Sequence, residues 1–118
     1  MNLKTSTRTS GFATIVDCSG KIVFGEECTH LRDQVKEALT KSKQVVLNLD
    51  GVTYIDSSGV GTLVGLHASA KAGGGAIKLA GLSGRVKDVL VITKLHTIFE
   101  TYDSAEEAAG SFATAGVK

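Results

Sequence analysis

Asp50-Gly51-Val52-Thr53-Tyr54-Ile55-Asp56-Ser57-Ser58-Gly59-Val60-Gly61 is the stretch that decides the fold. Before it lies Val45-Val46-Leu47-Asn48-Leu49, an apolar run typical of a buried parallel strand. After it, apolar or semi-apolar side chains recur at helix spacing at Val60, Leu63, Val64, His67 and Ala68. We therefore expect Asp-Ser-Ser-Gly to lie where a loop enters a helix. Exposed backbone N–H groups there favour negative charge, so two hydroxyls on this rim indicate a switch or docking site.

The size and composition are those of an ordinary soluble globule. A chain of 118 residues predicts one domain, 1–118, which can bury a core without disulfides. The formal net charge is +1 and no stripe of Lys or Arg is present, so we expect no direct nucleic-acid binding. Lys36, Lys41 and Lys43 gather around one predicted helix end, where cations suit the helix dipole.

The location of the protein is predicted from the segments that the chain lacks. No stretch approaches the roughly 20 apolar residues that span a bilayer. The N-terminal residues have no apolar core of a signal peptide. Cys18 and Cys28 form no C-x-x-C pair and no disulfide framework, so we expect them to be reduced and structural. These features predict a cytoplasmic protein without a membrane partner.

The first part of the chain predicts β structure. Residues 3–9 are polar and rich in Thr, as in an edge strand. Residues 12–16 and 21–24 are two short β runs, or one strand with a kink at Ser19-Gly20, where glycine supplies positive-φ freedom. We expect these opening strands to be antiparallel neighbours.

A helix is predicted from residue 30 to residue 41. It places Leu31, Val35, Ala38 and Leu39 on one face. Thr29 is the predicted cap, and the preceding glutamates at 26 and 27 suit the positive end of the dipole. The buried strand at 45–49 follows.

The rest of the chain continues the alternation of helix and strand. Gly73-Gly74-Gly75 ends the second helix, residues 76–80 form a strand, and Ser83 opens a third helix. Residues 96–99 are predicted as a short last strand, and Ser104-Ala105-Glu106-Glu107 has the spacing of a capping box for a final helix. Such alternation requires crossover connections and hence an α/β fold with a mainly parallel sheet covered by helices.

The second helix carries a face of small residues, and two interpretations of it are open. The residues on this face are Ser58, Gly61, Gly65, Ser69 and Ala72. Two glycines inside a helix cost about 1 kcal/mol each relative to alanine, which suggests that another surface comes close. That surface is either the domain's own sheet or neighbouring helix, or a partner that lands beside the serines.

Enzymatic chemistries fit the sequence poorly. A serine hydrolase needs a G-x-S-x-G elbow, a histidine base and an orienting acid, but the glycine pattern is absent around Ser57 and only His96 follows in the expected order. The glycine-rich segments lack both phosphate-loop patterns. A phosphoaspartate receiver built on Asp50 or Asp56 would need more acids than Asp17 to hold magnesium.

The histidines predict no metal site. His30, His67 and His96 each stand apart from Cys, Asp and Glu at metal-ligand spacing. We therefore expect neither a metal nor another cofactor.

With these residues in view, the chain resembles the STAS family, in particular the small anti-sigma factor antagonists. The resemblance covers nearly the whole length and is strongest from Val45 through the Asp56-Ser57-Ser58-Gly59-Val60-Gly61 motif, and in Leu82-Ser83 with Val86 through Leu95. It implies a mixed, mainly parallel sheet of four to five strands with about four helices packed on one side. It also implies no enzyme activity.

The resemblance implies a function as a partner switch in the regulation of transcription. In the family, an anti-sigma factor that is itself a serine kinase phosphorylates the serine after the motif's aspartate, which here is Ser57. The unphosphorylated form binds the kinase and frees the sigma factor, and a serine phosphatase resets the cycle. Asp56 helps to dock or orient the site and is itself expected to contact the partner. Partner binding is expected to involve the remaining motif residues and the next small residue of the helix, Ser58, Gly59, Val60, Gly61 and Gly65.

One departure from the family pattern concerns the partner. Many close antagonists carry an aspartate shortly after the glycine in the strand before the first helix, whereas this chain has Gly20-Lys21-Ile22-Val23. Two alternatives follow: a STAS subunit that docks on an ABC-transporter ATPase without phosphorylation, and a component of a stress-sensing scaffold. In each case we expect a monomer or weak dimer.

Overall fold

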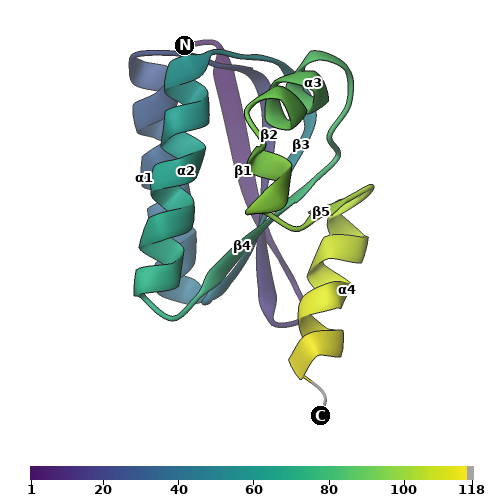
Figure 1. Ribbon diagram of the computed structural model, residues 1–118. Coiled ribbons are helices and arrows are strands. Elements are labelled where there is room, and N and C mark those ends of the chain that lie inside the picture. The colour runs from purple at the N-terminus through teal and green to yellow at the C-terminus, as the bar shows by residue number, and fades with distance from the viewer. Residues whose placement is uncertain (117–118) are drawn as a thin grey trace.

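The computed structural model describes the backbone of residues 1–116 and the side chains of residues 1–112. Its elements follow in the order β1 (Leu3–Ser10), β2 (Ala13–Ile22), α1 (Glu26–Lys41), β3 (Gln44–Ile55), α2 (Ser57–Ala72), β4 (Ala76–Ala80), α3 (Gly84–Ile92), the 3-10 turn η1 (Leu95–Thr97), β5 (Thr101–Tyr102) and α4 (Ala105–Gly116). The sheet has the strand order β1-β2-β3-β4-β5, and only the β1–β2 pair is antiparallel. The predicted α/β class with a mainly parallel sheet is confirmed (Figure 1).

The opening segment is a hairpin of two long strands. The runs predicted at 12–16 and 21–24 merge into one strand, β2, which begins at Ala13 and ends at Ile22. It carries register irregularities between Asp17 and Ser19 and between Gly20 and Lys21. Gly20 has φ 108°, and a Cβ at this position would collide with the carbonyl oxygen of Asn2. The residues on either side of Ser19-Gly20 therefore form one kinked strand and not two strands joined by a turn, because β2 stays paired with both β1 and β3 through the bend.

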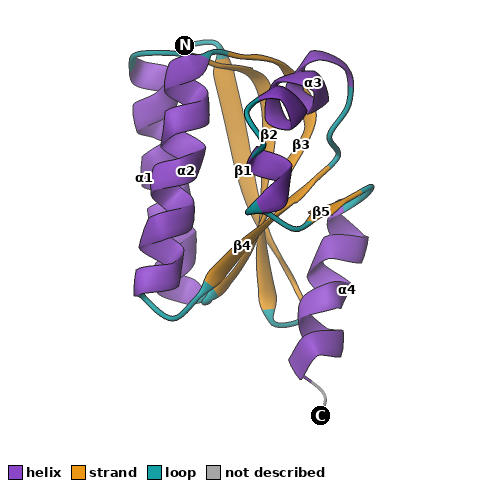
Figure 2. Cartoon of the chain, in the orientation of Figure 1, coloured by secondary structure: helices purple, strands orange, loops and turns teal. Residues whose placement is uncertain are grey.

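The main core lies between the sheet and the helices α1, α2 and α3. Residues two apart on a strand face the same side, so Val45, Leu47 and Leu49 of β3 enter this core. They meet Leu31 and Val35 of α1, as the periodicity of that helix predicts. In Figure 2 α1 and α2 stand side by side along one side of the sheet.

The fourth helix corrects the expectation that all helices pack on one side. Val46 points to the opposite face from its neighbours and joins Ile15 in a second core. The helix α4 covers that core with Ala108 and Phe112. In addition, Nζ of the buried Lys78 on β4 donates to Oγ of Ser111 on α4 at 2.7 Å and lies 4.2 Å from the Phe112 ring centroid. An uninterrupted apolar strand has two faces to bury, so one layer of helices is insufficient.

Three local predictions are also wrong. The first helix begins at Glu26, its N-cap is Gly25, and Thr29 lies inside it. Residues 96–99 form no strand, because Leu95 and Phe99 fill the core four residues apart, which is the spacing of a helical turn. The strand predicted there lies farther on, in β5.

The buried stripe of α2 is rotated from its predicted position. Its buried residues are Gly59, Thr62, Leu63, Leu66 and Ala70, whereas Val64 and Ala68 are exposed. Apolar side chains occur on several faces of this helix, so periodicity alone could not identify the inward one. The capping box of the last helix is confirmed, since the backbone N–H of Glu107 donates to Oγ of Ser104 at 3.1 Å.

Candidate functional site

The Asp-Ser-Ser-Gly segment lies where β3 passes into α2 with a single residue between them. The strand extends through the buried Ile55, so residues 50–55 form no loop. Asp56 is the N-cap of α2, and its Oδ1 accepts the backbone N–H of Gly59 at 2.8 Å. This contact satisfies one of the free donors at the helix start.

The second carboxylate oxygen of Asp56 fastens the neighbouring loop. Oδ2 accepts the backbone N–H of Phe24 at 2.9 Å, and the backbone N–H of Asp56 donates to the carbonyl of Ile22 at 3.2 Å. Burial opposes ionisation of this carboxylate, but hydrogen bonds from the backbone N–H groups of Phe24, Gly59 and Ser58 outweigh it and hold the pKa of Asp56 below its usual range. The starts of α1 and α2 are thus held together by one ionised side chain.

The two serines of the motif occupy different positions. Ser57 is the first residue of α2 and is exposed. Ser58 is half-buried, and its carbonyl accepts the hydroxyl of Thr62 at 2.9 Å. The hydroxyl of Ser57 is therefore the more accessible of the two at the positive end of the helix.

The glycines of α2 divide into two kinds. Gly59 is buried, and a Cβ there would lie 2.5 Å from the carbonyl oxygen of Ile22 and 2.6 Å from Cγ1 of Ile55. A Cβ at Gly61 or Gly65 would meet nothing within 4 Å. Among the glycines of α2, a close approach inside the fold therefore explains Gly59 alone. Val60 is half-buried at the edge of the core.

Gly61 and Gly65 border a groove of about 580 Å³ between α1 and α2. The wall from α2 is mostly small or polar, with the buried Leu66 at its base, and its residues are Ser58, Gly61, Thr62, Gly65, Leu66 and Ser69. The opposite wall and the upper end are formed by Phe24, Gly25, Cys28, Thr29, Arg32 and Lys36. The small face of the second helix is thus open, and the interpretation that it packs against the domain's own elements does not hold for its two central glycines.

Sequence reasoning missed three residues that surround the site. Phe24 is 78% exposed beside the Asp56 cap, and Arg32 and Lys36 line the groove. Lys36 lies within α1 and not in its last turn, so the dipole explanation of that lysine is wrong. The four-residue spacing of the two cations was the available signal, because it places both on one face of a helix.

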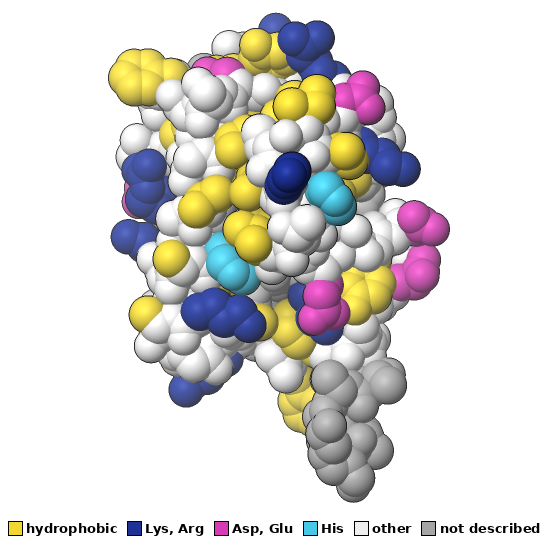
Figure 3. All heavy atoms as spheres, in the orientation of Figure 1, with side chains coloured by type: hydrophobic (Ala, Val, Ile, Leu, Met, Phe, Trp, Pro, Cys, Tyr) yellow, Lys and Arg dark blue, Asp and Glu magenta, His cyan; other side chains and the backbone are white. Residues whose placement is uncertain are grey.

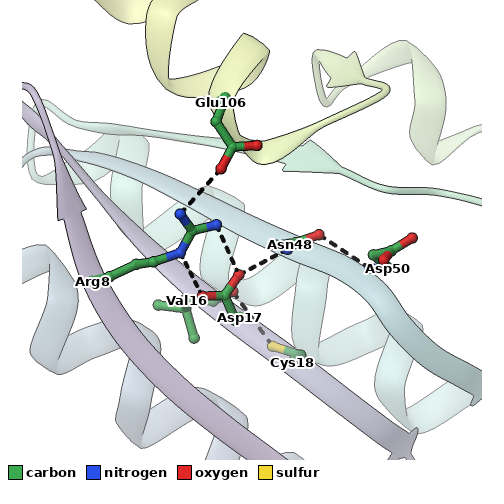
Figure 4. A network of polar contacts seen from close by, with 7 residues as sticks. All are labelled: Arg8, Val16, Asp17, Cys18, Asn48, Asp50 and Glu106. Carbon is green, nitrogen blue, oxygen red and sulfur yellow. Dashed lines mark hydrogen bonds and ion pairs between the residues drawn. The ribbon is translucent and has the colours of Figure 1, made fainter.

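A second polar cluster lies on the opposite side of the sheet (Figure 4). Arg8 of β1 donates to both oxygens of Asp17, at 2.7 and 3.3 Å, and to Glu106 of α4 at 3.1 Å. The amide of Asn48 on β3 also donates to Asp17, at 2.8 Å. The hydrogen bond from Arg8 is the main reason that the pKa of Asp17 lies below its usual range. Asp17 thus ties the edge strand to the sheet.

His67 and the other possible metal ligands do not form a metal site in the described part of the chain. The ring of His67 meets that of Phe99 edge-on, with centroids 4.9 Å apart. Among the residues whose side chains are described, no three His, Cys, Asp or Glu gather as metal ligands. Within the same part of the chain, no helix is long and apolar enough to cross a membrane.

Apolar side chains are exposed on the face formed by α2, α3 and η1. Figure 3 shows them among lysines and arginines on this side of the molecule. Val91, Ile92 and Ile98 are 49%, 78% and 43% exposed. Exposed apolar side chains of this kind are one mark of a protein contact surface.

The STAS domain model matches residues 3–108, and the chain belongs to the STAS family. The anti-sigma factor antagonist SpoIIAA, in its unphosphorylated form, has a similar structure with a TM-score of 0.77 and 19% identity, covering 98% of this chain and 100% of that one. A candidate anti-sigma factor antagonist from Thermotoga maritima gives a TM-score of 0.77 at 25% identity over 91% and 92% of the two chains. The murine anion transporter Slc26a9 gives 0.76 at 18% identity, with 92% of this chain matching 19% of the transporter.

Proposed function

We propose that this single STAS domain is a cytoplasmic anti-sigma factor antagonist and not an enzyme. In its unphosphorylated form it binds an anti-sigma factor that is a serine kinase, and phosphorylation of Ser57 releases that kinase. A serine phosphatase restores the binding form. The observation that carries the proposal is an exposed Ser57 at the start of α2, beside an open groove whose glycines have no packing role inside the fold.

The charge of a phosphate explains how such a switch would work. A phosphoserine carries about −1.5 to −2 charges at neutral pH. The helix start tolerates this charge, so the fold is kept. The phosphate would lie next to the ionised Asp56, where the combined negative charge repels an apolar or acidic partner surface. The change is then a loss of docking, with little change of structure. SpoIIAA, which is similar in fold, has also been solved in a phosphorylated form.

The decisive experiment incubates the chain with ATP and each anti-sigma factor serine kinase encoded in the same genome, followed by peptide mass spectrometry. We expect one phosphate, on Ser57. Ser57→Ala should remove it, and Ser58→Ala serves as the matched control that keeps it. Phosphate on another residue, or none with any kinase, would contradict the proposal.

The binding half of the proposal is tested with the same kinase. Ser57→Asp should abolish kinase binding in isothermal titration calorimetry while the circular dichroism spectrum stays that of the wild type. Ser57→Ala, which adds no charge, should still bind. Tight binding by Ser57→Asp would show that charge at this position is not the switch.

The alternative function is a docking subunit that is never phosphorylated, either on a transporter ATPase or in a stress-sensing scaffold. Two observations support this alternative function. The chain is similar in fold to part of an anion transporter, and α3 and η1 carry exposed apolar residues. A docking subunit of this kind would bind its partner equally well as wild type and as Ser57→Asp, and would lose binding with Ile92→Ser. The antagonist is expected to show the opposite dependence on Ser57.

A further inference from the structure

The α1 wall of the groove carries positive charge that the fold does not use. Arg32 and Lys36 lie one helical turn apart, and neither forms an ion pair with any residue of 1–112. The nearby Glu37 pairs with Lys41 instead, at 3.7 Å. Like charges four residues apart destabilise a helix slightly. Their placement therefore gains nothing for α1 itself.

The groove offers these cations no negative partner of its own. Its lining, which comes entirely from the described side chains, includes neither Asp nor Glu. Asp56 lies beside its upper end, but both oxygens of that carboxylate are already occupied by backbone N–H groups. Within residues 1–112, therefore, no carboxylate pairs with these two cations, and a partner that brings negative charge would complement the groove.

The shape of the groove favours a stretch of polypeptide over a small anion. Its α2 wall runs from Ser58 to Ser69, which is about 16 Å at the rise of an α-helix. Gly61 and Gly65 leave the middle of this wall open. A free anion would occupy one point near a cation, whereas an acidic segment can follow the whole wall.

We propose that the α1–α2 groove binds an acidic polypeptide segment of the partner through Arg32 and Lys36. The inference rests on the proposed function for the identity of that partner. It also names the force by which phosphorylation acts. Ser57 adjoins Ser58 at the end of the groove, so a phosphate there places negative charge within about a Debye length of the entering acidic segment. Like-charge repulsion then expels the segment.

The groove is tested without the kinase by nuclear magnetic resonance on the full ¹⁵N-labelled chain. The probe is a blocked peptide of alternating Glu and Ala, long enough to span the groove, and the reference is its Lys-Ala counterpart. We expect chemical-shift changes at Arg32, Gly61, Gly65 and Ser69 with the acidic peptide only, weakening as salt is added. Changes confined to other surfaces, equal changes with both peptides, or none at all would overturn the proposal.

A charge-matched pair of variants identifies the cations. Arg32→Glu with Lys36→Glu should weaken binding of the acidic peptide about tenfold, since two favourable contacts become repulsive. Lys87→Glu with Lys94→Glu changes the net charge equally at exposed positions around α3 and should leave affinity within about twofold of the wild type. Equal losses of affinity in both double variants would show that the peptide responds only to the net charge of the protein, and would overturn the assignment to the groove.

The kinase separates this inference from the proposed function. If a kinase modifies Ser57 and binds the Arg32→Glu, Lys36→Glu variant as tightly as the wild type, the groove assignment fails and the antagonist function stands. If no kinase modifies Ser57 but the acidic peptide binds in the groove, the antagonist function fails and the groove assignment stands.

Discussion

Alanine at two glycines of α2 should change stability in opposite directions. Gly59 and Gly61 lie two residues apart in the same helix, so both gain about 1 kcal/mol of helix propensity on substitution by alanine. They differ in what the new methyl group meets. At Gly61 it meets nothing within 4 Å, whereas at Gly59 it overlaps the carbonyl oxygen of Ile22 and Cγ1 of Ile55.

The magnitudes follow from these contacts. Gly61→Ala should raise the free energy of unfolding by about 1 kcal/mol and the melting temperature by roughly 4 °C. The overlap at Gly59 is with backbone as well as side chain, and the carbonyl of Ile22 is held by the N–H of Asp56 at 3.2 Å, so it cannot easily move away. Because the overlap includes backbone, we place the overpacking cost in the upper part of its usual range, at about 2–3 kcal/mol. After the propensity gain of about 1 kcal/mol, Gly59→Ala should be less stable than the wild type by about 1–2 kcal/mol.

Urea unfolding followed by far-ultraviolet circular dichroism measures both variants against the wild type. The slope of the free energy against urea should be unchanged, because the surface exposed on unfolding is nearly the same. The reasoning would be refuted by a Gly59→Ala protein as stable as the wild type, or by a Gly61→Ala protein that is less stable. Gly65→Ala, which also meets no neighbour, should repeat the result of Gly61→Ala.

Three further predictions concern titratable groups. Asp56→Ala should lower the free energy of unfolding in urea by about 1 kcal/mol at neutral pH. Because the folded pKa of Asp56 is lowered, this stability is present above the unfolded pKa of about 3.9 and is lost as pH falls through the folded pKa. The two proteins should therefore become equally stable in acid, and a difference that stays constant with pH would contradict the argument. Arg8→Ala should cost at most about 1 kcal/mol, diminishing at high salt, since the pair with Asp17 is partly exposed; a salt-independent loss would mean that packing of the arginine stem dominates. Cys18 and Cys28 are both buried, and burial raises the pKa of the Cys18 thiol to about 12. Ellman's reagent should therefore reach neither cysteine until urea is added, and rapid reaction of the native protein would refute their burial.

The parts of the fold that sequence predicts well are those with a local cause. The apolar run 45–49, the stop at Gly73-Gly74-Gly75, the strand at 76–80 and the capping box at Ser104 each depend on neighbouring residues, and each is confirmed. The errors occur where distant elements decide. The strand predicted at 96–99 becomes a turn because Leu95 and Phe99 reach a core built by other elements.

The candidate site divides in the same way. Ser57 at a helix start and Asp56 beside it are apparent from the order of strand, motif and helix. The second partner of Asp56, the N–H of Phe24, lies 32 residues away and depends on β2 and β3 ending at the same edge of the sheet. The groove likewise requires α1 and α2 to lie side by side. The sequence alone therefore could not show that Arg32 and Lys36 of α1 face the small residues of α2.

The sequence by itself determined the alternation of strands and helices, the buried central strand, and an exposed serine at the start of a helix, because each follows from residues close together in the chain. Only the tertiary structure decided that α4 covers the second face of the sheet, that Gly59 is required by packing, and that Gly61 and Gly65 open onto a cationic groove. The physical reason is that one glycine looks like another in sequence, while its role depends on which atoms of distant residues stand opposite the missing side chain.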